Sequence, residues 1–272
     1  MRLLPSEYFA RAVMVSEIGP EGLERLREGK VAVVGAGGVG SVAAQCMVKS
    51  GLGYLRVIDQ DIVEPSNLHR LHGASEDDLY KPKAEVAAEA LSKASPWAKV
   101  EPVVDTLRWS NARDLLDGVD LVVDCLDNFR SRYILNRVSR ETEKPYLFTS
   151  AVANQGHLAV FEPPNTACLE CVMPNVIDRP EESCESLGVT PAVVELVGSI
   201  AASEALKLLL DMPTMLGGAL LTVDLTGPQF VLSRISKRES CPTCGLTRTD
   251  SKTRDRVLLM LCGANTVNVV PE

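Results

Sequence analysis

The chain has 272 residues, 46% of them hydrophobic and 24% charged, and its formal net charge at pH 7 is −8. This composition is typical of a globular protein large enough for one or two domains, and the acidic balance argues against a nucleic-acid-binding surface. We find no long uncharged apolar run and no secretory pattern at the N-terminus. We therefore expect a cytoplasmic protein without a membrane partner.

The first secondary structure lies before residue 30. Pro5–Arg27 predicts two short helices, separated where Ile18, Gly19 and Pro20 interrupt the pattern. The next element is a strand, because Lys30–Gly35 is a short β-branched run of the kind found at the centre of a parallel sheet.

A glycine-rich turn follows this strand directly and leads into a helix over Ser41–Ser50. Its glycines are Gly35, Gly37, Gly38 and Gly40. The spacing of the first, second and fourth fits the phosphate-binding fingerprint of nucleotide-binding folds. The start of the helix would present unpaired amides and a positive dipole to an anion. The glycines alone would favour a dehydrogenase.

The polar run after the next strand changes that preference. Tyr54–Ile58 predicts a strand that ends at Asp59, at the place of a ribose-binding acid. A second acid, Asp61, comes two residues later, and the run reaches Asn67 and Arg70. Arginine binds phosphate oxygens through two parallel hydrogen bonds, whereas a dinucleotide enzyme has little use for these side chains here.

These two motifs resemble the hallmarks of the ThiF/MoeB/HesA family, the bacterial and archaeal relatives of ubiquitin-activating E1 enzymes. The family pattern reads G-x-G-G-x-G, then D-x-D-x-V-E-x-S-N-L-x-R-Q, and this chain departs from it at Leu71, in place of the last Gln. The resemblance implies an adenylyltransferase that uses ATP and Mg²⁺. A C-terminal glycine carboxylate of a ubiquitin-like or sulfur-carrier protein (ThiS- or MoaD-like), ending in Gly-Gly, would attack the α-phosphate. A sulfur donor and a homodimer are also implied.

The same resemblance implies roles for single residues. Asp59 would contact the ribose and Asn67 would lie near the phosphates, while Asp61 belongs to the same nucleotide site. The remaining implied groups are Arg11, reaching across the dimer interface into the partner's site, Arg70 and Lys83 as cations, and Asp127 as the magnesium ligand.

The rest of the chain predicts an α/β, Rossmann-like domain with a mixed, partly antiparallel sheet. Lys81-Pro82-Lys83 starts a strong helix, and Asp124 and Asp127 follow a strand; Asp124 could equally be a cap or a turn residue. By the resemblance, the antiparallel half would carry the ubiquitin-like partner. The expected later elements are strands over Val100–Val104, Leu121–Val123, Pro145–Ala151, Leu158–Phe161, Leu220–Asp224 and Phe230–Ile235, and helices over Asn128–Arg140 and Val193–Leu210.

Two cysteine pairs predict a structural zinc site. They are Cys168-x-x-Cys171 and Cys241-x-x-Cys244. Four thiolates form a closed tetrahedral site, and a zinc joining two distant segments would stabilise one domain. A redox pair or a coincidental spacing are the alternatives. We expect Cys46 and Cys125, in a helix and a strand, to be packed and inert.

Cys184 lies in a polar, charged stretch, Asp178–Gly188, that predicts an exposed loop. By the resemblance this is the crossover loop, whose cysteine takes the activated acyl group in some members and is dispensable in others. The glutamates at 181, 182 and 185 would raise the pKa of the thiol. Both roles stay open.

We assign residues 1–245 to an E1-like adenylating domain and residues 246–272 to a C-terminal extension, expected to form a β-hairpin. Three other functions remain open. A non-catalytic E1-like subunit would account for Leu71 and for Ala12, another position where a family Gln is absent. An NAD-dependent Rossmann oxidoreductase and a tRNA-modifying dehydratase share the nucleotide fingerprint.

Overall fold

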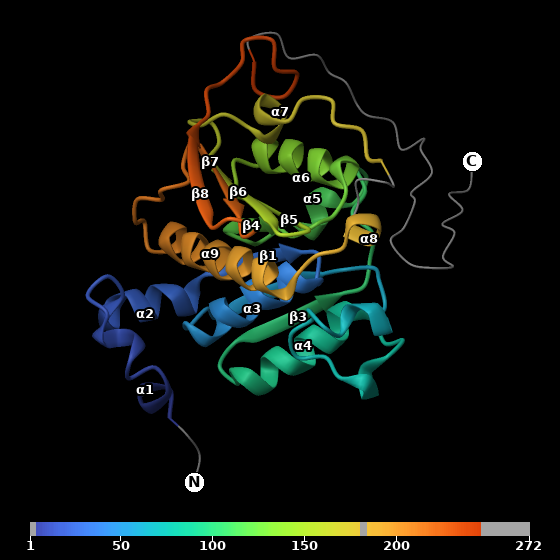
Figure 1. The fold of residues 1–272 in the computed structure, drawn as a ribbon. Coiled ribbons are helices and arrows are strands. Elements are labelled where there is room, and N and C mark those ends of the chain that lie inside the picture. The colour runs from blue at the N-terminus through green and yellow to red at the C-terminus, as the bar shows by residue number, and fades with distance from the viewer. Residues whose placement is uncertain (1–3, 180–183, 246–272) are drawn as a thin grey trace.

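The computed structural model describes residues 4–179 and 184–245, apart from the side chains of residues 184 and 185. These residues form one eight-stranded sheet with the order β3-β2-β1-β4-β5-β6-β7-β8 (Figure 1). Strands β3 to β5 are parallel, and β6, β7 and β8 continue the sheet in antiparallel pairing. The mixed sheet is therefore confirmed. The strands are β1 Lys30–Val34, β2 Tyr54–Ile58, β3 Lys99–Val103, β4 Leu121–Asp124, β5 Tyr146–Val152, β6 Gln155–Phe161, β7 Ala219–Asp224 and β8 Gln229–Arg234.

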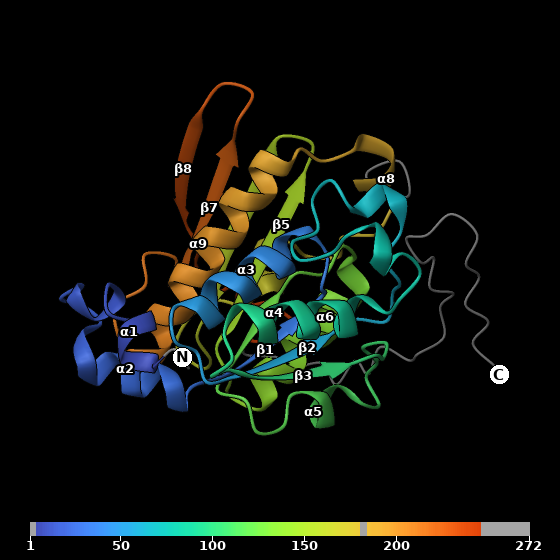
Figure 2. The same cartoon turned by 90° about the horizontal axis from the view of Figure 1, so that it is seen from below.

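Helices cover both faces of the parallel half (Figures 1 and 2). One hydrophobic cluster packs α3, α4 and α9 against the sheet, and a second packs α5, α6 and α7 against the other face. In the described chain no helix is long and apolar enough to cross a membrane. The helices are α1 Pro5–Tyr8, α2 Gly19–Glu28, α3 Gly38–Lys49, α4 Lys83–Ala94, α5 Ala112–Leu115, α6 Phe129–Glu141, α7 Leu169–Val172, α8 Cys184–Leu187 and α9 Pro191–Leu209, with 3₁₀ turns η1 Ala12–Met14, η2 Pro65–Asn67 and η3 Glu76–Asp78.

The prediction of two helices separated at residues 18–20 is wrong in part: α1 already ends at Tyr8, and Gly19 and Pro20 form the first turn of α2. The boundaries of the other predicted elements agree to within two residues, except for two starts. Helix α3 begins at Gly38 rather than Ser41, so the last glycines of the turn are already helical. Strand β6 begins at Gln155 rather than Leu158, because the β5–β6 hairpin pairs Val152 with Gln155 and extends the ladder into polar residues. Neither extension has an apolar pattern that would have predicted it.

The order of the strands places a topological switch point at the carboxyl ends of β1 and β4. Strand β2 lies on one side of β1 and β4 on the other, so the chain changes direction across the sheet between them. Open α/β sheets bind ligands at such a switch point. The glycine turn follows β1 here and Asp127 follows β4.

A buried polar network supports the loop after β4. Asp124 is fully buried; it accepts a hydrogen bond from the Leu126 amide at 2.9 Å and another from the Tyr146 hydroxyl. Arg132, 4% exposed, lies 3.8 Å from the Asp124 carboxylate and donates to the carbonyls of Leu126 and Thr149. Burial raises the pKa of Asp124. Asp124 is thus a structural residue beneath the site. Of the roles that the sequence left open, the bond to the Leu126 amide makes it a turn residue.

The expected hairpin over 246–272 lies outside the described residues, and it stays a prediction together with the domain boundaries.

Candidate functional site

The glycines of the turn after β1 serve two different purposes. A Cβ on Gly35, which has φ +99°, would lie 2.5 Å from the Cys125 carbonyl oxygen, and one on Gly40 would lie 1.9 Å from the Gly35 carbonyl oxygen. These two glycines allow close packing of backbone on backbone. A Cβ on Gly37 would have no heavy atom of the described residues within 4 Å. Gly37 therefore leaves open space at the start of α3.

The start of α3 is suited to bind an anion. The first amides of any helix lack carbonyl partners within the helix, and the N-cap here, Gly37, has no side chain to supply one. Together with the helix dipole, these amides favour a negatively charged group such as a phosphate.

Asp59 joins the end of β2 to the glycine turn. One carboxylate oxygen accepts a hydrogen bond from the Ala36 amide at 2.6 Å, and the other accepts from the Asp61 amide at 2.7 Å. Burial raises the pKa of Asp59 to about 6, with Lys83 opposing the shift and Asp61 adding to it. The carboxylate is thus placed beside the space that Gly37 leaves open.

Lys83 is the first residue of α4, and its side chain is 13% exposed. The Nζ atom donates to a carboxylate oxygen of Asp61 at 3.0 Å. Burial opposes its charge, but the carboxylates of Asp59, Asp61 and Asp127 outweigh burial and raise the pKa of Lys83. Side chains from three separate segments, residues 59–61, Lys83 and Asp127, therefore share one electrostatic environment that keeps the lysine charged.

Asp127 is exposed in the loop between β4 and α6. Its carboxylate accepts a hydrogen bond from the Asn128 amide group at 3.3 Å. Asn128 is in turn the N-cap of α6 and accepts from the Ser131 amide at 2.9 Å. An exposed carboxylate on a loop fixed in this way fits a hard divalent cation, which prefers oxygen ligands.

Asn67 and Arg70 belong to the turn η2 and the residues after it. Asn67 is 9% exposed and accepts from the Glu64 amide at 3.2 Å, so its side chain closes the turn. Arg70 donates to the Ser66 carbonyl at 2.7 Å, and its Cγ lies 3.3 Å from where a Cβ on Gly38 would be. The aliphatic part of Arg70 thus lies beside the start of α3, while its guanidinium is bonded to the η2 turn.

Arg11 does not reach the site of its own chain. The hydroxyl of Tyr8 donates to the Ala94 carbonyl at 2.8 Å, which fixes α1 at the C-terminal end of α4. Lys83 lies at the other end of that helix, about 16 Å away at 1.5 Å per residue. Arg11 itself is exposed, and its guanidinium lies 3.6 Å from the Met14 sulfur. The segment that carries Arg11 is thus held at the end of α4 opposite Lys83.

The departure at Leu71 has a packing explanation. Leu71 is 8% exposed and packs with Val63 and Val86 in a small apolar cluster beneath the η2 segment. The next residue, His72, donates its amide to the Ser41 hydroxyl at 3.0 Å, and Ser41 donates to the Gly38 carbonyl at 2.8 Å. Ser41 thus holds the segment after Arg70 against the start of α3, a role for which the sequence offered no signal.

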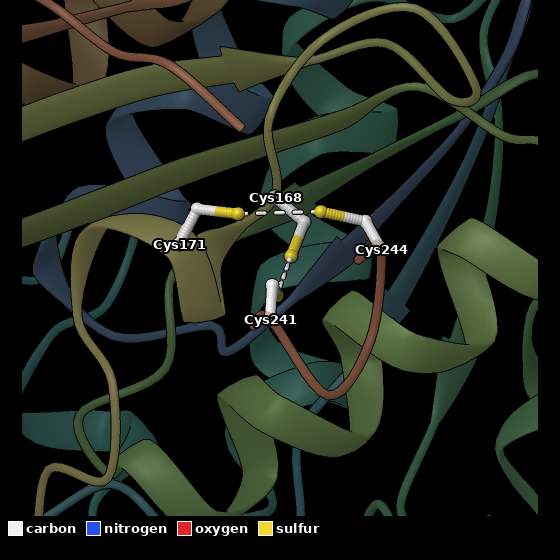
Figure 3. Close-up of side chains that lie close together, drawn as sticks. All are labelled: Cys168, Cys171, Cys241 and Cys244. Carbon is white, nitrogen blue, oxygen red and sulfur yellow. Dashed lines mark hydrogen bonds between the residues drawn. The ribbon is translucent and has the colours of Figure 1, made fainter. Parts of the chain in front are cut away.

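The two cysteine pairs meet in space, as Figure 3 shows. All four sulfur atoms lie within 4.8 Å of one another, with Cys168 3.6 Å from Cys241 and Cys171 3.2 Å from Cys244. Zinc bonds of about 2.3 Å in tetrahedral geometry separate the sulfurs by about 3.8 Å. The cluster therefore fits a tetrahedral metal ion, and these separations are too long for disulfides.

The other cysteines differ in what the structure describes. Cys46 lies in α3 as predicted, whereas Cys125 lies one residue beyond β4 rather than in the strand, and both are partly buried against the core. Burial raises the pKa of Cys125 to about 12 and also raises that of Cys46, so both thiols stay protonated. Cys184 is the first residue of the short helix α8, so the predicted loop over 178–188 is wrong for residues 184–187. The side chain of Cys184 lies outside the described part of the chain, and its role stays a prediction.

Comparison with known proteins gives consistent matches. The model of the ThiF family matches residues 9–245. The chain is 38% identical over 247 residues to the SAMP-activating enzyme E1 of Haloferax volcanii, covering 89% of this chain and 90% of that protein. It is 36% identical over 247 residues to the sulfur carrier protein adenylyltransferase of Thermus thermophilus, covering 87% and 90%. It is 30% identical over 243 residues to the sulfur carrier protein ThiS adenylyltransferase of Escherichia coli, covering 89% and 96%.

Among solved structures, E. coli MccB with MccA-N7isoASN superposes with a TM-score of 0.77 at 20% identity, covering 89% of this chain and 77% of that one. E. coli MccB with ATP gives a TM-score of 0.73 at 20% identity, covering 82% and 68%. At this identity the likeness establishes the fold.

Substituting Gly37 should separate binding from folding. Gly37 has an ordinary extended backbone and open space around it, so Gly37→Ala should leave the free energy of unfolding within about 0.5 kcal/mol of wild type. The added methyl group should weaken ATP binding by about tenfold or more, because it occupies the path of the phosphate to the amides. Calorimetric titration with ATP measures this. Gly40→Ala is the contrasting control and should unfold the protein. A folded Gly37→Ala variant with wild-type affinity would contradict the assignment.

Asp59 should make stability depend on pH. Its folded pKa of about 6 lies above the value of about 3.9 for an unfolded aspartate. Its charge therefore destabilises the fold above pH 6, and the penalty disappears as the pH falls toward 4. From pH 4.5 to 7.5, wild type should lose on the order of 1–3 kcal/mol relative to Asp59→Asn. Urea denaturation without nucleotide measures this, with the exposed Asp117→Asn as control. A constant difference would exclude a raised pKa.

Proposed function

This chain belongs to the ThiF family, and we propose from that membership and the site geometry that it is an ATP-dependent adenylyltransferase. Its substrate would be the C-terminal glycine of a small ubiquitin-like or sulfur-carrier protein, activated for sulfur transfer or for conjugation. One observation carries the proposal: the open start of α3, Asp59, Lys83 and Asp127 meet at one edge of the sheet. To activate a carrier protein, an enzyme must hold the phosphates of ATP and the C-terminal carboxylate of the carrier together at one place.

The chemistry asks for positioning and charge, since a glycine carboxylate is already ionised and needs no general base. The carboxylate would attack the α-phosphate of ATP, forming an acyl-adenylate and releasing pyrophosphate. Arg70 and Lys83 would offset the charge that builds up between the two anions. Asp59 would bind the ribose, and the amides of α3 would bind phosphate. Asp127 would hold Mg²⁺, which neutralises phosphate charge when bound.

A homodimer would complete the site. Arg11 lies at the opposite end of α4 from Lys83. It would supply a third cation to the partner's site rather than to its own, in keeping with the role that the family resemblance implies. The exposed apolar side chains of Met14 and Val15 nearby support a contact in this region.

The carrier protein would dock on the antiparallel half of the sheet. Edge strand β8 exposes Phe230, Val231 and Leu232, which are 57%, 50% and 45% accessible. The sheet register connects Val231 through Thr222 and His157 to Ser150, near the carboxyl end of β5. The carboxyl end of β5 lies next to that of β4, so a flexible tail leaving a partner on β8 would point toward Asp127.

The four cysteines would hold a structural Zn²⁺ rather than a catalytic one. All four positions of a tetrahedral ion are filled by sulfur, which leaves none for a substrate. Cys168 is the N-cap of α7 and Cys171 lies within that helix, whereas Cys241 and Cys244 follow β8. The ion would therefore join two segments that are separated by 69 residues. Zinc bound in this way adds its binding energy to the stability of the fold.

Two routes remain after adenylation. In one, the acyl-adenylate is consumed directly. In the other, the Cys184 thiol displaces AMP, giving a thioester, or an acyl persulfide once sulfur has been delivered. Two alternatives to an adenylyltransferase gain no support. A non-catalytic E1-like subunit is not needed to explain Leu71, which packs in an apolar cluster. An NAD-dependent oxidoreductase leaves the Lys83–Asp61 pair without a role.

Exchange between ATP and pyrophosphate tests the activity. With magnesium and a candidate carrier, Arg70→Ala and Asp127→Ala should each lower the exchange rate by about 10²–10³, the usual effect of losing one oriented electrostatic group. Asp117→Ala, an exposed acid at the opposite edge of the sheet, is the matched control for Asp127 and should exchange normally. Near wild-type exchange by either site variant would show that the site is misplaced.

Metal analysis tests the cysteine cluster. The purified protein should contain one zinc per chain, and Cys241→Ser should lose the metal and lower the thermal midpoint. Cys46→Ser, which removes a thiol outside the cluster, should keep its zinc. A wild-type protein that is metal-free and equally stable would contradict a structural zinc site.

Cys184→Ser tests the second route. Exchange precedes any attack by the thiol, so the variant should exchange pyrophosphate at the wild-type rate. If the thiol forms the intermediate, wild type should give a DTT-sensitive adduct with the carrier on a non-reducing gel, and the variant should give none. Absence of the adduct from wild type under sulfur-donor conditions would leave direct consumption of the adenylate as the mechanism.

A further inference from the structure

The N-terminal end of α6 is capped by a side chain from a distant part of the chain. One carboxylate oxygen of Asp178 accepts from the Phe129 amide at 2.7 Å, and the other accepts from the Arg130 amide at 3.2 Å. The N-cap, Asn128, accepts from the Ser131 amide at 2.9 Å. Two side chains thus satisfy the first three amides of the helix, which would otherwise lack partners.

Helices α3 and α6 both begin at the carboxyl edge of the sheet, but their starts differ. Helix α3 has a glycine N-cap with no side chain, whereas the start of α6 already holds the Asp178 carboxylate. Of these two helix starts, only that of α3 has amides free of a capping side chain and so able to bind an anionic ligand. The start of α6 keeps a structural role, next to Asp127.

Asp178 belongs to a segment that follows α6 closely. The Tyr133 hydroxyl donates to the Met173 carbonyl at 2.7 Å and accepts from the Val176 amide at 2.8 Å. Farther along α6, Arg137 donates to the Glu170 carboxylate at 2.6 Å. Residues 170–178 are thus bonded to three successive parts of α6, and Asp178 makes the last contact, one residue away from the Asp127–Asn128 turn.

We propose that Asp178 is a positioning residue for Asp127. By capping α6 it fixes the turn that carries Asp127, so the exposed carboxylate is held in place for the divalent cation that accompanies ATP. This inference rests on the proposed function, in which Asp127 holds that cation. Without the cap, the turn is correctly placed in a smaller fraction of molecules, and the apparent affinity falls by that fraction.

Calorimetric titration of the whole chain with ATP, once in excess MgCl₂ and once in EDTA, tests the proposal without the carrier. Asp178→Ala should raise the Kd measured with magnesium by about five- to tenfold, the size expected for a lost helix cap. The Kd in EDTA should stay within about twofold of wild type. Asp178→Asn keeps one acceptor oxygen and should give a smaller, still magnesium-selective loss. Asp211→Ala, an exposed acid paired with Arg25 far from the site, should change neither value.

A purely structural role predicts a different result. In that case Asp178→Ala would lower the thermal midpoint, while the ratio of the two Kd values stayed that of wild type, which would overturn the proposal. If Asp178→Ala does not fold, the ratio for Asp178→Asn decides in the same way. Wild type that binds no ATP in either buffer would overturn the proposed function, and the positioning role with it.

Discussion

The site depends on the close approach of two loops, the glycine turn after β1 and the loop after β4. Their backbones meet where Gly35 passes the Cys125 carbonyl, at a distance that excludes any side chain on residue 35. This contact holds the start of α3 beside Asp127, although the two belong to different βα units. The buried Asp124–Arg132 network fixes the second loop from below. The constraint is thus packing and hydrogen bonding, and the polar groups at the surface inherit their positions from it.

The site contains both carboxylates and a lysine, so it suits a ligand that combines negative phosphates with a positive metal ion. Three carboxylates surround Lys83 and raise its pKa, and Asp61 binds its ammonium directly. A bare polyphosphate would meet the carboxylates as well as the lysine, so a divalent cation should accompany it. The same carboxylates keep the lysine charged while it is largely buried. This arrangement suits charge stabilisation during phosphoryl chemistry, because the groups need little reorganisation when charge develops.

Local pattern predicted the elements and the chemistry that are close in sequence. The β-branched runs gave β1 and β2 to within one residue, and the glycine spacing identified the turn. Short motifs led us to propose Lys83, Asp127 and the paired cysteines, and the structure brings Lys83 near Asp127 and the two cysteine pairs together. The supporting contacts were missed, since Asp178, Tyr133 and Arg132 act on backbone groups far away in sequence or inside the fold. A single sequence holds no signal for such contacts. It also could not explain why a leucine occupies position 71, because its apolar neighbours come from other segments of the chain.

The central claim is that the start of α3 binds the phosphates of ATP, with Lys83 and Asp127 on either side. A crystal structure of the protein with ATP and magnesium tests it most directly. We expect phosphate oxygens within hydrogen-bonding distance of the amides at the start of α3, and the metal on Asp127. The claim would be contradicted by triphosphate density at another edge of the sheet, or by phosphates on the start of α6 in place of Asp178.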